Sequence, residues 1–181
     1  MKDKGVKKDR LEGETIYLRL MGAEDTENII RWRNTDFVRS NFIYQKPFTR
    51  AGHENWMKNM IDTGKVVQFM ICRKMDGKPV GSVYLRDIDR DHHKAEYGIF
   101  IGEKDALGKG YGTEAAKMMI EYAFWEEGLH KLMLRVLAEN KQARRSYEKA
   151  GFVKEAYLKD EVFLEGRYKD VIYMAVINKN S

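Results

Sequence analysis

The sequence predicts a single domain of the mixed α/β (α+β) class, in which helices flank both faces of a central, mostly antiparallel twisted sheet of about seven strands. Three observations lead to this prediction. Short alternating segments separated by turn signals fill the first half of the chain, and a strand, a glycine-rich loop, a helix, a strand and a helix follow in the second half. The 181 residues are 43% hydrophobic, which is enough for one core. Hairpins followed by a βαβ unit give a mixed sheet with both faces covered.

Hydrophobic patterning places the elements of the first half. Apolar residues that alternate with polar ones predict strands, whereas apolar residues spaced by three and four predict helices. Asp76-Gly77 lies between two β-rich segments and indicates a hairpin turn. The expected elements are a strand at 15–20, helices at 25–34 and 50–61 around an irregular segment at 41–47, and hairpin strands at 66–74 and 79–87.

The same patterning places the elements of the second half. Ala115, Met119 and Ala123 recur on one face of a helix. Gly128 and Gly151 follow the two expected helices and suit their C-caps. The expected elements are strands at 94–101, 131–137, 152–158 and 168–177, a loop at 108–112, and helices at 113–127 and 140–150.

The basic charge of the chain is concentrated at its start. The net charge is +5, and residues 1–10 alone contribute +3 of it. A nucleic-acid-binding protein clusters its basic residues on the folded surface, so nucleic acid is not expected as a partner. We expect a basic flexible tail at 1–12 and a single domain at 13–178.

Membrane insertion and secretion are both disfavoured by the sequence. The longest apolar run, 171–177, is far shorter than the ~18 residues of a membrane helix. The charged N-terminus is followed by no apolar segment of the kind that a secretory signal has. Cys72 is the one cysteine, which excludes an intrachain disulfide and a cysteine-based zinc site. We therefore expect a cytoplasmic protein with no membrane partner.

A glycine-rich loop at 108–113 joins an expected strand to an expected helix. Glycines let the backbone approach a ligand closely, and a helix N-terminus offers free N–H groups, so the combination suits phosphate. The spacing does not fit a Walker A loop, because Gly110 stands where the hydroxyl residue belongs, and GxGxG is not the dinucleotide fingerprint GxGxxG. A plain strand–helix turn is the alternative.

A second motif follows at 139–152, which reads ENKQARRSYEKAGF. It resembles the closing motif of the GNAT acetyltransferases, N-x-x-A/S-x-x-x-Y-E-K-x-G-F. In that family the preceding glycine loop, usually Q/R-x-x-G-x-G/A, cradles the pyrophosphate of acetyl-coenzyme A. The two motifs stand in the family's order with a helix and a strand between them. The resemblance extends from about residue 15 to about residue 177, and it implies the GNAT fold and acetyl-coenzyme A as co-substrate, with no metal.

The resemblance also implies which residues hold acetyl-coenzyme A. The glycine loop would bind the pyrophosphate mainly through backbone N–H groups, and the preceding strand end would pair with the pantetheine arm. Leu107 stands where the family usually has Gln or Arg, which removes one side-chain contact. The implied cofactor-binding residues are Phe100, Ile101, Gly102, Leu107, Gly108, Lys109, Gly110, Tyr111, Gly112, Thr113 and Asn140.

Acetylation of an amine requires a proton acceptor for the amine and a proton donor for the departing thiolate. The resemblance implies that Tyr147 is the acid and that Glu96, fourteen residues before Gly110, is the base, acting through a water. Tyr147 as a packing residue and Asn140 as a helix N-cap are the plainer interpretations. The alternatives for the base are Asp87, Asp89, Glu103 or water alone.

The acceptor pocket of this family is built by the N-terminal helices, here about 25–60, and by the late segment at about 158–168. The first segment resembles GNAT members that acetylate nucleotide-linked aminosugars and also RimJ/RimL-like ribosomal-protein N-terminal acetyltransferases. Trp32, Arg33 and Arg39 are the expected substrate residues, because Arg stacks on bases and pairs with phosphates. In the alternative, Trp32 anchors a helix in the core and the arginines are solvated. Polyamines are less favoured because the segment is not strongly acidic.

The function predicted from the sequence is transfer of an acetyl group to a small-molecule or peptide amine, by direct attack in a ternary complex. A GNAT-fold sensor that binds acetyl-coenzyme A without turnover is the alternative; Leu107 favours it, and the presence of Tyr147 and Glu96 disfavours it. The four histidines lack metal-ligand spacing and are expected on the surface or in loops. A homodimer is compatible with the sequence, which identifies no interface.

Overall fold

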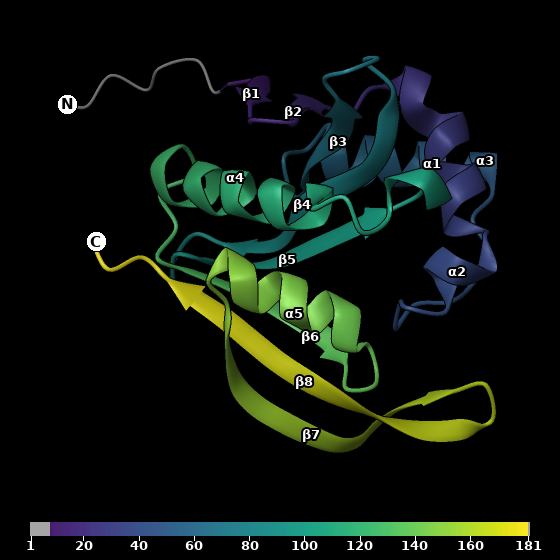
Figure 1. Cartoon of the computed structure of the whole chain (residues 1–181), viewed down its shortest axis with the longest axis vertical. Helices are drawn as coiled ribbons and strands as arrows, with labels where there is room; N and C mark the ends of the chain where they lie inside the picture. Colours follow the sequence, from purple (N-terminus) through teal and green to yellow (C-terminus); the bar gives the residue numbers. More distant parts are fainter. Residues whose placement is uncertain (1–7, 181) are drawn as a thin grey trace.

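The computed structural model describes residues 8–180, in which eight strands form one sheet (Figure 1). The strand order is β1-β2-β3-β4-β5-β6-β8-β7, and β5 with β6 is the one parallel pair in this described part. The mixed, mostly antiparallel sheet is therefore confirmed. The strands are β1 (Arg10–Glu12), β2 (Ile16–Leu20), β3 (Val67–Arg73), β4 (Pro79–Asp89), β5 (Lys94–Ile101), β6 (Lys131–Leu137), β7 (Val153–Leu164) and β8 (Arg167–Ile177).

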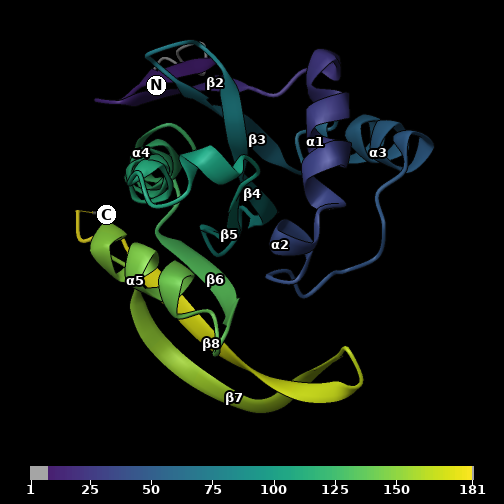
Figure 2. The same cartoon turned by 45° about the vertical axis from the view of Figure 1, so that its right-hand side comes forward.

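Helices cover both faces of the sheet, as Figure 2 shows. α4 and α5 lie side by side on one face, and α1 to α3 lie on the other. Among residues 8–180, none of these helices has the length and apolar character to cross a membrane. The helices are α1 (Thr26–Arg33), α2 (Asp36–Arg39), α3 (Arg50–Trp56), α4 (Tyr111–Trp125) and α5 (Lys141–Ala150), with short helices η1 (Ala23–Asp25), η2 (Met57–Ile61) and η3 (Lys104–Ala106).

The sheet separates two hydrophobic clusters. Successive side chains of a strand point to opposite faces, so neighbours on β3 belong to different clusters. Phe69 packs in the larger cluster with α4 and α5, whereas Met70 packs in the smaller one with Trp32 of α1 and Phe100 of β5. The face that carries α1 to α3 is called the acceptor face below.

The structure differs from the expectations in three places. Residues 10–12 form β1 and pair with β2, so the expected tail at 1–12 is wrong for its last three residues; residues 1–7 lie outside the described part. The expected helix at 50–61 is α3 followed by the π-helical turn η2. β7 and β8 were expected to end and begin at 158 and 168, but they continue as a hairpin to a turn at Glu165 and Gly166, both with positive φ.

β5 and β6 pair over only part of their length. Their register contains Lys94, Ala95 and Glu96 of β5 and ends there, while β5 continues to Ile101 paired with β4 alone. The β6-facing backbone edge of β5 beyond Glu96 therefore lies outside the β5–β6 ladder. An edge of this kind is ready to pair with another extended group, and the candidate site is centred on it.

Candidate active site

The glycine-rich loop enters α4 through backbone conformations that favour glycine. Gly108 has a φ of 71° and Gly110 a φ of 84°, both in the left-handed region. A Cβ atom at either position would meet nothing within 4 Å, so the space beside the loop is open. Because α4 begins at Tyr111, the free N–H groups of its first turn and the positive end of its dipole adjoin this space. The loop therefore fits the pyrophosphate of a coenzyme A thioester.

Gly110→Ala is expected to weaken acetyl-coenzyme A binding by about tenfold, because a left-handed alanine costs about 1–2 kcal/mol and shifts the first N–H groups of α4. Calorimetric titration with acetyl-coenzyme A measures the change. Gly64→Ala is the matched control, since Gly64 also has a positive φ of 70° and open space around it but lies in a different turn. Wild-type affinity in Gly110→Ala would show that the loop does not hold the ligand.

The start of α4 is tied to α5 beside the expected acid. The Thr113 and Ser146 hydroxyl oxygens are 2.9 Å apart, and Ser146 directly precedes Tyr147. Leu107 and Lys109 are exposed at the entrance of the loop. This hydrogen bond holds the start of α4 against α5. It therefore connects the loop that is expected to bind pyrophosphate with the helix that carries Tyr147.

Asn140 is the N-cap of α5, the plainer of its two interpretations. Its Oδ1 accepts a hydrogen bond from the Ala143 N–H at 3.1 Å, which is the usual N-cap bond. Its Nδ2 donates to Asn41 Oδ1 at 2.9 Å. Asn140 thus connects α5 to the irregular segment after α2, and its expected contact with the pantetheine arm stays a prediction.

Tyr147 lies in an aromatic group on the α5 side of β5. Its ring makes edge contacts with Tyr97, at a centroid distance of 6.1 Å, and with Phe152, at 6.0 Å. Burial raises the pKa of the Tyr147 hydroxyl above its ordinary value, and the nearby Tyr84 adds to this. A raised pKa keeps the phenol protonated at neutral pH, which a proton donor requires.

A second tyrosine crosses β5 from the acceptor face. A Cβ atom at Gly98 would lie 2.2 Å from the Tyr84 ring, so only glycine leaves room for this ring on the β5 backbone. Gly98 pairs with Tyr84 across β4 and β5, just beyond the point where β5 leaves β6. Burial raises the pKa of Tyr84, so this hydroxyl also stays protonated. Tyr84 and Tyr147 thus reach the same stretch of β5 from β4 and from α5.

Glu96, the expected base, lies at the last paired position of β5 and β6. Its Oε1 accepts a hydrogen bond from Arg86 Nη2 at 2.6 Å, and both Arg135 Nε and Nη2 are 3.3 Å from the same oxygen. Oε2 has one longer contact, 3.3 Å from Arg135 Nη2. Glu96 is therefore oriented by two guanidinium groups, and Oε2 keeps room to accept a hydrogen bond from a water.

Two of the alternative carboxylates have structural roles. Asp89 accepts hydrogen bonds from the backbone N–H groups of Asp91 and His92 at the β4–β5 turn. Glu103 accepts hydrogen bonds from Trp32 Nε1 at 2.8 Å and from the Arg31 guanidinium. Both stabilise the backbone or α1. Asp87, the third alternative, is exposed with its Oδ2 3.7 Å from Arg86 Nε, and the role of Glu96 as the base stays a prediction.

Trp32 is placed in the core, and the expectation that its ring stacks on a substrate is wrong in this structure. The side chain is fully buried, and it covers Gly102, where a Cβ atom would lie 2.1 Å from the indole. Phe100 packs against it at a centroid distance of 6.2 Å. Trp32 therefore anchors α1 on the end of β5, because burying an indole contributes more than exposing it to a ligand.

The two expected substrate arginines have different surroundings. Arg33 is only 6% exposed, and its guanidinium lies 3.3 Å from the centroid of Phe42. Arg39 is partly exposed at the end of α2, where it pairs with Asp36 at 2.6 Å. An exposed pair of this kind contributes little to stability, so Arg39 stays available to a ligand. The alternative interpretation, in which both arginines are solvated, is wrong for Arg33.

His53 also departs from its expected surface position. It is 3% exposed on α3, its ring stacks on Trp56 at 5.7 Å, and neither ring nitrogen has a hydrogen-bond partner. Burial lowers the pKa of His53, which favours the neutral ring. Within residues 8–180, no three His, Cys, Asp or Glu side chains gather as a metal site would need.

Sequence reasoning missed four residues that lie at the site. Tyr84 and Arg86 are on β4, and Arg135 is on β6. What such strand residues face depends on which strands pair, and that is not known before the sheet is assembled. Ser146 stood inside the quoted motif, next to Tyr147, and only its 2.9 Å contact with Thr113 shows its use. Glycine at position 98, within an otherwise bulky strand, was the one sequence signal for the close approach of Tyr84.

Known proteins with similar sequences and structures are acetyltransferases. Residues 15–153 match the acetyltransferase (GNAT) domain family. The spermidine N(1)-acetyltransferase of Escherichia coli K12 is 40% identical over 101 residues, which cover 56% of this chain and 54% of that protein. The ribosomal protein uS5 alanine N-acetyltransferase of the same organism is 26% identical over 184 residues, covering 94% and 92%. The match to the first relative thus spans about half its length.

Solved structures agree with the family match. The spermidine N-acetyltransferase of Vibrio cholerae, solved in complex with CoA and spermine, superposes with a TM-score of 0.84 and 28% identity. The superposition covers 90% of this chain and 95% of that one. The family model covers most of the chain, including the glycine loop, Glu96 and Tyr147. The chain therefore belongs to the GNAT family of acetyltransferases.

Proposed function

We propose that the protein transfers the acetyl group of acetyl-coenzyme A to an α-amine, such as the N-terminus of a peptide or protein, by direct attack within a ternary complex. The observation that carries the proposal is the separation of β5 from β6 beyond Glu96, with Tyr147 beside it and the open loop of Gly108 and Gly110 at the start of α4. A thioester, when bound, supplies an activated acyl group, so no covalent nucleophile of the protein is needed.

The β5 edge, the α4 N-terminus and Asn140 would hold acetyl-coenzyme A. Tyr147 Oη would give its proton to the departing thiolate, because its raised pKa keeps it protonated until then. Glu96 Oε2 would receive the proton of the amine through a water. The other oxygen, Oε1, already accepts hydrogen bonds from Arg86 and Arg135, so Oε2 is the oxygen left for the water.

The arrangement of Glu96 favours an acceptor that deprotonates readily. An α-amine has a pKa of about 8, whereas a lysine-like alkylamine has one of about 10.4. At pH 7 the free-base fraction of the α-amine is therefore larger by about two orders of magnitude. An acceptor that is already partly deprotonated depends less on the single Glu96 oxygen that is open to a water. We place the reaction in the cytoplasm, since Cys72 is a buried free thiol of the kind that reducing compartments allow.

Thiol release from acetyl-coenzyme A is expected to depend on an added α-amine acceptor. The panel contains peptides with free N-termini, a nucleotide-linked aminosugar, a free aminosugar and spermidine, each at several concentrations. Release with the peptides above all others supports the proposal, and release with spermidine alone contradicts its choice of acceptor. Tight acetyl-coenzyme A binding without release for any amine would support a sensor, which the absence of Gln or Arg at the Leu107 position favours.

A further inference from the structure

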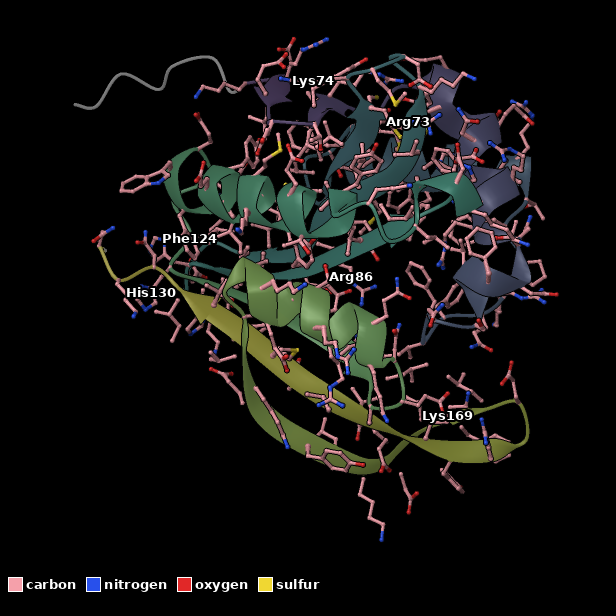
Figure 3. All side chains as sticks on the ribbon, in the orientation of Figure 1. Arg73, Lys74, Arg86, Phe124, His130 and Lys169 are labelled. Atoms are coloured by element: carbon pink, nitrogen blue, oxygen red, sulfur yellow. The ribbon has the colours of Figure 1, made fainter. Side chains whose placement is uncertain are left out.

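Three guanidinium groups gather near β5 on the acceptor face. Arg33 comes from α1, Arg86 from β4 and Arg135 from β6. Arg33 and Arg86 are close enough for each to influence Tyr84, and the charge of Arg86 contributes to lowering the pKa of Arg33. Figure 3 labels Arg86, which comes from β4, near the middle of the molecule.

The positive charges in this group exceed the negative ones. Glu96 accepts hydrogen bonds from Arg86 and Arg135. Within residues 8–180, no other carboxylate is hydrogen-bonded to any of the three arginines. Asp87 is exposed, and its Oδ2 lies 3.7 Å from Arg86 Nε. One half-buried carboxylate against three guanidinium groups leaves a surplus of cationic donors on this face.

Arg33 is the most deeply buried of the three arginines, and one of its donors has no hydrogen-bond partner. Its side chain is more than nine-tenths buried, its Nη2 donates to the Tyr44 carbonyl at 3.2 Å, and its Nη1 has no hydrogen-bond partner. Burial lowers its pKa to about 10. Aromatic rings of Phe42 and Phe48 lie against it at 3.3 and 4.7 Å from their centroids. Cation–π contacts compensate a buried guanidinium only in part.

Arg86 also keeps a free donor in this region. Its Nη2 is used by Glu96, but its Nε is buried without a hydrogen bond. Phe42, Tyr44 and Phe48, which contact Arg33, belong to the irregular segment at 41–49, which lies outside the sheet. Phe100 of β5 lies on the other side, with its ring centroid 5.8 Å from the guanidinium. A shift of that segment would open Arg33 Nη1 without breaking a strand ladder.

We propose that Arg33 and Arg86, with the Tyr84 hydroxyl beside them, bind an anionic group that the amine acceptor carries, a carboxylate or a phosphate. Guanidinium donors match the paired oxygens of such groups and gain most where water is excluded. A polycation such as spermidine would meet like charges here. The proposed acceptor therefore differs from spermidine, after which two of the similar proteins are named. This inference rests on the proposed function, since it names the acceptor class for the same site.

Matched pairs of acceptors that differ in one anionic group test the proposal. The pairs are alanine and alaninamide, an Ala-Glu and an Ala-Gln peptide, and a nucleotide-linked aminosugar and its free sugar. The charged member of at least one pair is expected to have a kcat/KM at least tenfold higher, and that pair identifies the source of the anion. Equal values within every pair, or spermidine as the best acceptor, would overturn the proposal.

The same pairs are compared by calorimetric binding to the protein loaded with coenzyme A, so the test does not depend on turnover. Preferential binding of the charged members without acetyl transfer would support the anion site and contradict the proposed function. Absence of preference in both readouts would overturn the anion site alone.

Arg33→Gln is expected to reduce the preference for the charged member, measured as the ratio of the two kcat/KM values, to within about threefold. Arg50→Gln is the matched control, because Arg50 lies on α3 with its side chain 60% exposed. A preserved preference in a folded Arg33→Gln protein would overturn the role of Arg33. The wild-type comparison needs no variant, so it decides the proposal even if Arg33→Gln does not fold.

Discussion

Replacing Tyr147 by phenylalanine is expected to lower kcat by about 100-fold and to leave the Kd for acetyl-coenzyme A within a few-fold. A positioned proton donor typically contributes 10²–10⁴-fold, and the substitution removes only the hydroxyl. The ring contacts with Tyr97 and Phe152 are kept, so the folded structure should not change. Steady-state kinetics with the best acceptor and calorimetry with acetyl-coenzyme A give the two quantities separately.

Tyr157→Phe is the matched control for this experiment. Tyr157 lies on β7, is exposed, and donates its hydroxyl hydrogen to Asp170 away from the strand separation. Its replacement should leave kcat unchanged. Unchanged turnover in Tyr147→Phe would remove Tyr147 from the chemistry, and a large loss of acetyl-coenzyme A affinity would mean that the hydroxyl mainly binds the ligand.

Trp32→Ala is expected to lower the free energy of unfolding by about 3–5 kcal/mol, the range for a buried large side chain replaced by alanine. The substitution removes an indole that is fully buried between α1 and β5, and it leaves Glu103 without its 2.8 Å donor. Part of the space above Gly102 becomes a cavity, because Gly102 has no side chain to fill it. Urea unfolding followed by circular dichroism measures the change.

Trp125→Ala makes the same substitution at an exposed position. Trp125 lies at the end of α4 with 67% of its surface exposed, so its replacement should change stability by no more than about 0.5 kcal/mol. Similar losses for both variants would show that the effect comes from tryptophan content and not from the anchor at Trp32. A loss below about 1 kcal/mol for Trp32→Ala would contradict the anchoring role.

Local patterns were sufficient to predict most of the fold. The Asp76-Gly77 turn and the alternation around it gave the β3–β4 hairpin, and the spacing of Ala115, Met119 and Ala123 gave α4, with the buried face that the structure shows. β1 was missed because three charged and apolar residues next to a basic start carry no periodic signal. Its pairing with β2 is a long-range property of the assembled sheet.

The site was predictable to the extent that it follows a local motif. The glycine loop and Tyr147 are encoded within short segments, and the structure places them around the separation of β5 and β6. The burial of Arg33 was not predictable, since Arg33 faces the core beside its sequence neighbour Trp32. For Trp32 the core position was one of the two interpretations of the sequence. The pairing of Glu96 with Arg86 and Arg135 joins three strands, and no single segment contains that information.

The part of β5 beyond Glu96 contributes to both hydrophobic clusters and also forms the unpaired edge of the candidate site. Tyr97 points into the cluster under α4 and α5, Phe100 into the cluster under α1, and the edge between them is turned toward the gap left by β6. Because strand side chains alternate with a period of two, a single inserted or deleted residue would exchange the inner and outer faces. A changed loop or side chain would alter the site without this exchange, whereas a change in the length of β5 would misplace residues of both clusters at once.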